Sequence, residues 1–232
     1  MSRVGRDFIV ERNFGPYIVK STISDELHDI LLKGAYKIKK NKNKRKDNDY
    51  RKSLAGNLSE EYHYGNIFTP EEDRIVEDEL RWMASTYTKL SLKAIGTDYS
   101  REPKDIILLR PVWVNFMKQG EWNPAHNHTG DISCVAYLKV PNEINEENKS
   151  SESSSKSNTP SAGKIEFLYG DNIGYMSTGS IRSPKEKEIY FFPAKLLHQV
   201  YPFKSKAERI SISANFADAT TARQNLNGEG AR

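Results

Sequence analysis

Three histidines in the second half of the chain have the residue type and the spacing of metal ligands. His126 and His128 are two residues apart, and His198 lies in a strongly apolar segment far along the chain. Side chains two apart on a β-strand point to the same side, and neutral imidazole is the commonest metal ligand. The three histidines therefore predict a facial metal site with positions left open for substrate and oxidant. Polar residues on a solvent-facing strand remain the alternative for the closely spaced pair.

An arginine and a serine follow the last of these histidines. Arg209 and Ser211 alternate with Ile210 and Ile212, so the polar pair shares one face of a predicted strand and the isoleucines share the other. An arginine among core strands must meet an anion, because an unpaired buried charge costs too much. Its planar guanidinium suits a carboxylate, and a neighbouring hydroxyl adds a donor. The anion is either an internal Asp or Glu or the carboxylate of a bound molecule.

The elements that must position these residues are short strands. Segments rich in β-branched and aromatic residues are separated by glycine and proline turn signals; they span residues 105–117, 131–140, 163–169, 187–193, 196–203 and 208–216. Such a series predicts an antiparallel sandwich or barrel. Residues 142–162 are rich in Ser, Asn, Glu and Lys, which predicts a mobile surface insertion within this β-rich part.

The N-terminal part of the chain is predicted to be helical. Ser24 can cap a helix whose apolar residues recur at helical spacing as far as Ile38. Residues 69–72, Thr-Pro-Glu-Glu, form the capping-box pattern of a second helix, which Gly96 ends. We therefore expect a helical extension with a basic loop over residues 1–100, packed on a β core over residues 101–220, and a flexible tail over residues 221–232.

Composition and charge exclude several classes of protein. The 232 residues carry a net charge of +4, with one cysteine and 10% aromatic residues, which argues against both a disulfide scaffold and a disordered chain. No apolar run approaches the length of a membrane span, so we expect no membrane partner and a cytoplasmic location. Residues 37–52 contain nine Lys and Arg against two Asp and could attract nucleic acid. A solvated loop is favoured there, because nucleic-acid sites alternate basic residues with aromatic side chains on which bases stack, and this tract lacks that alternation.

These motifs together resemble those of the Fe(II)- and 2-oxoglutarate-dependent oxygenases. The family pattern is His-x-Asp/Glu, a distant His, and an Arg about ten residues further, often as Arg-x-Ser. The chain matches it with His126-Asn127-His128, His198 and Arg209-Ile210-Ser211. The stretch from Asn123 to Pro141 is similar to a group of these oxygenases common in bacteriophages and marine bacteria, which for a phage protein implies the host cytoplasm. The resemblance covers roughly residues 105–216.

The resemblance implies a fold, a cofactor and a cosubstrate. The fold would be mainly β with some α: a double-stranded β-helix, or jelly roll, with N-terminal supporting helices. Fe(II) would be held by His126, His128 and His198. The distal carboxylate of 2-oxoglutarate would meet Arg209, Ser211 and, by analogy with the prolyl-hydroxylase branch, Tyr137. The activity implied is hydroxylation of a substrate that the sequence does not identify, with a protein or peptide side chain such as proline preferred by analogy.

One position departs from the family pattern. The usual carboxylate ligand, two residues after the first histidine, is here His128. Either all three ligands are histidines, as in the thiol dioxygenases of the cupin class, or Asp131 reaches in from the following turn. The strand alternation favours the all-histidine set. Two rival functions stay open: a cupin-like dioxygenase that needs no 2-oxoglutarate, with Arg209 binding the substrate's own carboxylate, and a non-catalytic jelly-roll binding module.

Overall fold

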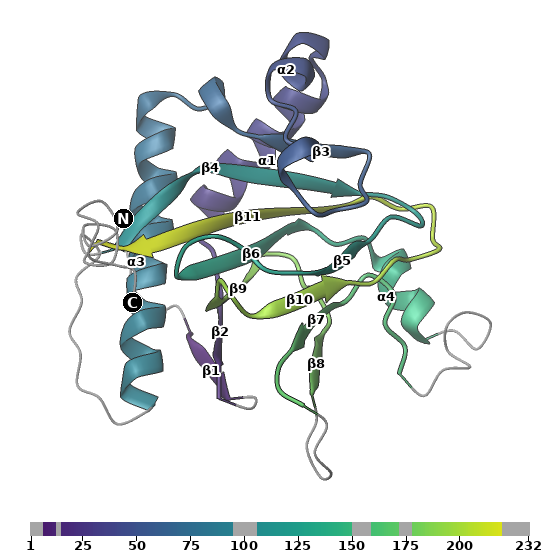
Figure 1. Cartoon of the computed structure of the whole chain (residues 1–232). Coiled ribbons are helices and arrows are strands. Elements are labelled where there is room, and N and C mark those ends of the chain that lie inside the picture. The colour runs from purple at the N-terminus through teal and green to yellow at the C-terminus, as the bar shows by residue number, and fades with distance from the viewer. Residues whose placement is uncertain (1–6, 13–14, 95–105, 150–158, 172–177, 220–232) are drawn as a thin grey trace.

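Two antiparallel sheets form the centre of the molecule (Figure 1). The computed structural model describes residues 7–12, 15–94, 106–149, 159–171 and 178–219. The seven-stranded sheet contains, in spatial order, β1 (Ile9–Arg12), β2 (Tyr17–Thr22), β9 (Glu188–Pro193), β6 (Ile132–Lys139), β11 (Arg209–Asp218), β4 (Ile106–Met117) and β3 (Glu60–His63). The four-stranded sheet contains β5 (Asn123–His126), β10 (Leu197–Val200), β7 (Ile165–Leu168) and β8 (Gly179–Arg182).

The chain passes repeatedly from one sheet to the other between β4 and β11. Strands β4, β6, β9 and β11 are neighbours in the larger sheet, whereas β5, β7, β8 and β10 make up the smaller one. All pairings are antiparallel among the described strands. Eight strands divided in this way between two sheets are the arrangement of a jelly roll. The six segments predicted to be strands all contain one.

Two long helices cover the outer face of the larger sheet. Helix α1 (Asp25–Lys39) begins after Ser24, whose hydroxyl accepts a hydrogen bond from the Leu27 N–H. Helix α3 (Pro70–Ala94) begins with the predicted capping box, in which Thr69 and Glu72 each accept a hydrogen bond from the other's N–H. Both helices are confirmed as far as they are described, while the predicted end at Gly96 lies outside the described residues.

The apolar residues divide into two cores. One lies between the helices and the larger sheet and includes Leu80, Phe116 and Ile212; the other lies between the two sheets and includes Phe167 and Phe192. Strand β11 separates them, because its successive side chains alternate between its faces. Its isoleucines enter the core under the helices, so its polar residues face the space between the sheets.

The first hundred residues contain more strand than the sequence analysis predicted. Strand β1 pairs with β2, β2 pairs with β9, and β3 pairs with β4, so N-terminal strands extend both edges of the larger sheet. A purely helical N-terminal extension was therefore wrong, because these short segments become strands through partners elsewhere in the chain. The division into residues 1–100 and 101–220 stays a prediction.

The insertion predicted over residues 142–162 is partly helical. Helix α4 (Asn142–Lys149) forms its first part, and Ile144 is buried in the core between the sheets. A mobile loop was expected for these residues; they form a helix instead, in which Ile144 packs in this core and Asn148 donates a hydrogen bond to the Ala162 carbonyl. Residues 150–158 and the predicted tail 221–232 lie outside the described residues.

The basic tract over residues 37–52 is partly neutralised within the fold. It contains the short helix α2 (Lys42–Asp47) and the turn η1 (Arg51–Ser53). Lys39 forms ion pairs with Glu60 and Glu208, and Arg51 pairs with Asp49. Nucleic-acid binding through this tract stays a prediction. Among the described helices, including η2 (Gly65–Ile67), none has the length and apolar character needed to cross a membrane.

Candidate active site

The three predicted histidines converge between the two sheets. Strands β5 and β10 pair with His126 directly opposite His198. His128 lies two residues beyond the end of β5, where its N–H donates a hydrogen bond of 2.8 Å to the Ala194 carbonyl. One potential ligand atom from each ring lies within 4.8 Å of the others. The two closely spaced histidines thus meet, but strand alternation does not explain it, because β5 ends at His126 and the hydrogen bond to Ala194 positions His128.

Hydrogen bonds orient two of the imidazole rings. The Nδ1 of His126 lies 2.6 Å from the Pro124 carbonyl oxygen, and the Nδ1 of His198 lies 3.0 Å from the Leu196 carbonyl oxygen. A carbonyl oxygen only accepts, so each Nδ1 carries the proton and each Nε2 keeps a free lone pair. Such outer hydrogen bonds fix the tautomer of metal-binding histidines.

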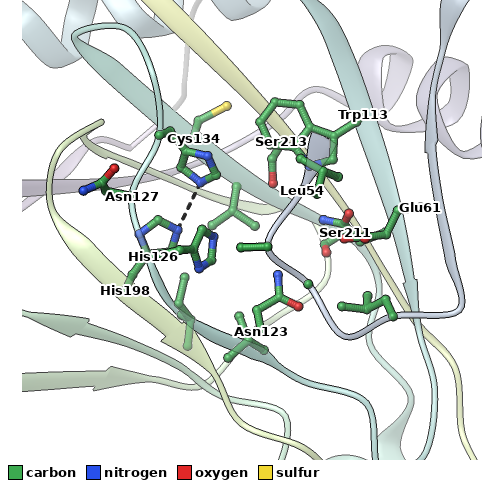
Figure 2. A pocket seen from close by; sticks show the side chains of 18 of the residues that line it. Leu54, Glu61, Trp113, Asn123, His126, Asn127, Cys134, His198, Ser211 and Ser213 are labelled. Carbon is green, nitrogen blue, oxygen red and sulfur yellow. Dashed lines mark hydrogen bonds between the residues drawn. The ribbon is translucent and has the colours of Figure 1, made fainter. Parts of the chain in front are cut away.

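The environment of the rings keeps them neutral. Burial lowers the pKa of His128 to about 4 and that of His198 to about 3, and it also lowers the pKa of His126. The Nε2 atoms of His128 and His198 are 3.2 Å apart (Figure 2, dashed line). Three neutral, converging imidazoles, of which His198 is buried and His126 and His128 are partly buried, are a donor set that suits a divalent transition metal.

Asp131 does not join this cluster. Its carboxylate accepts a hydrogen bond of 2.8 Å from the Asp218 N–H, and its own N–H donates to the Phe216 carbonyl at the same end of β11. The preceding Gly130 has a φ of 88°, and a β-carbon there would lie 2.7 Å from the Phe216 oxygen. The turn is thus attached to β11, and in the described part of the chain the cluster contains only the three histidines.

Arg209 is buried between the two sheets, and it has no acidic partner among the described residues. Its side chain is 3% exposed, and its Nη1 donates a hydrogen bond of 2.6 Å to the Gly163 carbonyl. Its guanidinium carbon lies 5.5 Å from the centre of the Tyr137 ring, and its Nε has no hydrogen-bond partner. Burial lowers the pKa of Arg209 because the charge is desolvated. An internal ion pair, one of the two interpretations of this arginine, is absent among the described residues.

A row of polar side chains crosses four strands of the larger sheet at this level. Tyr137 on β6 is opposite Ser211 on β11, Ser211 is opposite Asn115 on β4, and Asn115 is opposite Glu61 on β3. The Tyr137 hydroxyl, Asn115 Oδ1 and Glu61 Oε2 are buried and have no hydrogen-bond partner in the part of the chain that the structure describes. Sequence reasoning missed Asn115 and Glu61. A polar residue in the apolar strand around Asn115 was a usable signal, whereas Glu61 follows another glutamate and belongs to no such strand pattern.

These residues line one cavity of about 190 Å³ (Figure 2). His126 and His198 lie on one side of it in this view, and Glu61 and Ser211 lie on the other. The segment of residues 53–56 also lines it. Cys134 lies in the wall, where burial raises the pKa of its thiol to about 12, so it is a structural thiol rather than a nucleophile. The cavity therefore joins a candidate metal site to an unpaired buried cation.

The chain is similar in sequence to one family of oxygenases. Residues 111–215, somewhat less than half of the chain, match the family model described as "Putative 2OG-Fe(II) oxygenase". This stretch contains all three histidines, Tyr137, Arg209 and Ser211. No curated protein matches the chain. The similarity to a bacteriophage and marine-bacterial group of oxygenases stays a prediction.

Solved structures resemble the chain in fold. The non-haem α-ketoglutarate-dependent epimerase SnoN from nogalamycin biosynthesis has a TM-score of 0.54 at 12% identity, covering 88% of this chain and 78% of that one. A prolyl-4-hydroxylase from Pseudomonas putida has a TM-score of 0.44 at 13% identity, covering 86% of this chain and 92% of that one. The predicted fold, a jelly roll that is mainly β with supporting helices, is confirmed. Residues 111–215 are the part of the chain that is similar in sequence to the 2-oxoglutarate- and Fe(II)-dependent oxygenases.

Proposed function

We propose that the protein is an Fe(II)- and 2-oxoglutarate-dependent dioxygenase that hydroxylates its substrate. Fe(II) would be held by His126, His128 and His198, whose imidazoles are neutral and converge. The single observation that carries the proposal is a fully buried Arg209 without an acidic partner in the cavity that these histidines line. A cation in that position requires an anion, and the family match indicates which one.

The donors around Arg209 suit the distal carboxylate of 2-oxoglutarate. The guanidinium has an unpaired Nε, and Tyr137 contributes an unpaired buried hydroxyl. Ser211 is 2% exposed and lies opposite Tyr137 in the β-ladder. A carboxylate held by a guanidinium and two hydroxyls satisfies these donors and compensates the buried charge. The arginine, serine and tyrosine would thereby orient the cosubstrate so that its 2-oxo acid end faces the histidines.

The histidines set the charge at the metal. Three neutral imidazoles leave a divalent ion its full charge, whereas one carboxylate ligand would reduce it. Trp113 lies against His128, with ring centres 5.6 Å apart, and limits the movement of that ring. Bound Fe(II) would supply the activation of dioxygen that couples decarboxylation of 2-oxoglutarate to hydroxylation of a C–H bond. By analogy with the prolyl hydroxylases, the substrate would be a protein or peptide side chain such as proline.

The test is an anaerobic titration of Fe(II)-loaded protein with 2-oxoglutarate. The wild type is expected to develop the weak visible charge-transfer band of a chelated 2-oxo acid, and Arg209→Ala and His128→Ala are expected to lose it. Iron binding without the band, together with oxygen uptake that does not need 2-oxoglutarate, would favour the cupin-like dioxygenase. A protein that binds no iron would contradict both enzymes and leave the non-catalytic binding module.

A further inference from the structure

The cavity contains a second set of buried polar groups that binding of 2-oxoglutarate leaves unused. Glu61 is 1% exposed although β3 is an edge strand, and Asn115, opposite it on β4, is 7% exposed. Both side chains line the cavity. They lie on the two strands beyond β11, on the side of Ser211 away from Tyr137.

The free atoms of this pair are acceptors. Glu61 Oε2 and Asn115 Oδ1 are both buried and have no hydrogen-bond partner among the described residues. An unsatisfied buried acceptor costs about 1–3 kcal/mol, and such groups are rare in folded proteins. Two of them on neighbouring strands, facing one cavity, call for a ligand that brings hydrogen-bond donors.

The charges around Glu61 show what kind of donor fits. Burial raises the pKa of Glu61 most, Glu121 and Asp49 raise it further, and Arg51 lowers it, with a result of about 7. Glu61 forms no ion pair in the described structure; the Arg51 guanidinium instead pairs with Asp49. The surroundings therefore leave a buried carboxyl short of positive charge, which a bound cation would supply.

The segment of residues 53–56, which lines the cavity, lies close to the carboxyl. A β-carbon added at Gly56 would lie 2.6 Å from Glu61 Oε1 and 3.1 Å from Asn123 Oδ1. Glycine thus lets the backbone of the covering segment approach the carboxyl closely. A carboxyl in this confined position, with Oε2 free among the described residues, can select a ligand by shape as well as by charge.

We propose that Glu61 and Asn115 form a subsite for a positively charged nitrogen of the primary substrate, such as the ammonium of a lysine or the guanidinium of an arginine side chain. This inference rests on the proposed function. The cavity then separates its two ligands by charge: the dicarboxylate cosubstrate binds at Arg209, and Glu61 repels it from the substrate side. Within the proposed function, this subsite favours a basic side chain over the proline suggested by analogy, because a prolyl ring within a peptide carries no charge and would leave Glu61 and Asn115 unsatisfied.

The experiment measures binding of small capped amino acids to the anaerobic Fe(II)–2-oxoglutarate complex by calorimetry. The cationic probes are the N-acetyl methylamides of lysine and arginine, and the neutral counterparts of similar shape are those of norleucine and citrulline. The variant is Glu61→Gln. The matched control is Glu60→Gln, the same change one residue earlier, where the carboxylate pairs with Lys39 and Lys118 outside the cavity lining.

The wild type and Glu60→Gln are expected to bind a cationic probe roughly tenfold or more tightly than its neutral counterpart. Glu61→Gln is expected to lose this preference while keeping the visible band of bound 2-oxoglutarate. Equal binding of charged and neutral probes, a preference that survives Glu61→Gln, or no binding of either cation would overturn the subsite. The band distinguishes the two proposals: a wild type without it refutes the oxygenase, whereas a band without cation preference refutes only the subsite.

If Glu61→Gln does not fold, as judged by circular dichroism and loss of the band, Asn115→Ala replaces it. That variant removes the second acceptor and is expected to weaken cation binding while keeping the preference for charge. Unchanged affinity in Asn115→Ala would contradict the subsite.

Discussion

Replacing Arg209 with methionine should make the ligand-free protein no less stable, and this is unusual for a buried arginine. Exchanging a buried charge for an apolar side chain of similar volume is often neutral or stabilising, by about 1–4 kcal/mol. Arg209 has no acidic partner among the described residues, so no carboxylate is left behind by the change. The lost hydrogen bond to Gly163 costs about 1 kcal/mol. The net expectation for Arg209→Met is a free energy of unfolding about 0–3 kcal/mol above that of the wild type.

The same substitution should abolish stabilisation by the cosubstrate. At a 2-oxoglutarate concentration of about one hundred times Kd, a ligand that binds only the folded state adds about 2.7 kcal/mol. For a chain of this size, this corresponds to a rise in Tm of about 5–11 °C. Thermal unfolding of the anaerobic Fe(II) protein, with and without 2-oxoglutarate, measures both effects. The wild type should show the rise and Arg209→Met should not.

Arg110→Met is the control for the loss of an arginine elsewhere on the same sheet. Arg110 is partly exposed and pairs with Asp73 at 2.8 Å and Glu77 at 3.1 Å. Exposed pairs contribute about 0–1 kcal/mol, so this variant should be slightly less stable and keep the full ligand-induced rise in Tm. The reasoning is refuted if ligand-free Arg209→Met loses several kcal/mol while its response to 2-oxoglutarate is retained, because Arg209 would then be a structural residue.

Three further changes test other parts of the site. His128→Ala should weaken Fe(II) binding at least tenfold in a competition titration. Asp131→Ala should leave Fe(II) binding unchanged, because the Asp131 carboxylate accepts a hydrogen bond from the Asp218 N–H. The reverse result would make Asp131 the ligand. Tyr137→Phe should weaken 2-oxoglutarate binding about tenfold in the same visible titration, and an unchanged Kd would exclude its buried hydroxyl from the cosubstrate site. The native pKa of Glu61 is raised, so the unfolded wild type loses this proton at a lower pH than the folded protein does. The wild type should therefore lose stability as pH rises from 4.5 to about 7, and Glu61→Gln should gain stability relative to it. Measured by urea unfolding, the relative gain in the free energy of unfolding should approach about 3 kcal/mol. A difference between variant and wild type that does not change with pH would show that Glu61 titrates normally.

Local patterns predicted much of the secondary structure. The capping residues Ser24 and Thr69 mark the starts of both long helices, and each segment rich in β-branched and aromatic residues contains a strand. These signals lie in residues close together in the chain. Strands β1, β2 and β3 were missed because their pairing partners are distant in sequence, and propensity alone does not predict such pairing.

The candidate site was predictable where its residues belong to a short-range pattern. The alternation of Arg209 with isoleucine placed Arg209 and Ser211 on one side of β11, because a strand has a period of two. The spacing of His126 and His128 identified this pair, although β5 ends at His126 and the backbone hydrogen bond to Ala194 positions His128. Glu61 had no such signal. It is buried because β3 pairs with β4 and because residues near Gly56 cover it, and both contacts depend on the fold.

The sequence by itself therefore determined the kinds of group available: three imidazoles, a guanidinium and hydroxyls in strands of the right alternation. Only the tertiary structure decided which of them meet and which lack a partner. It attached Asp131 to the end of β11, left Arg209 without an internal carboxylate, and placed Glu61 and Asn115 together as free acceptors. The physical reason is that alternation and capping are local, whereas burial, pairing and desolvation depend on every element that closes around a side chain.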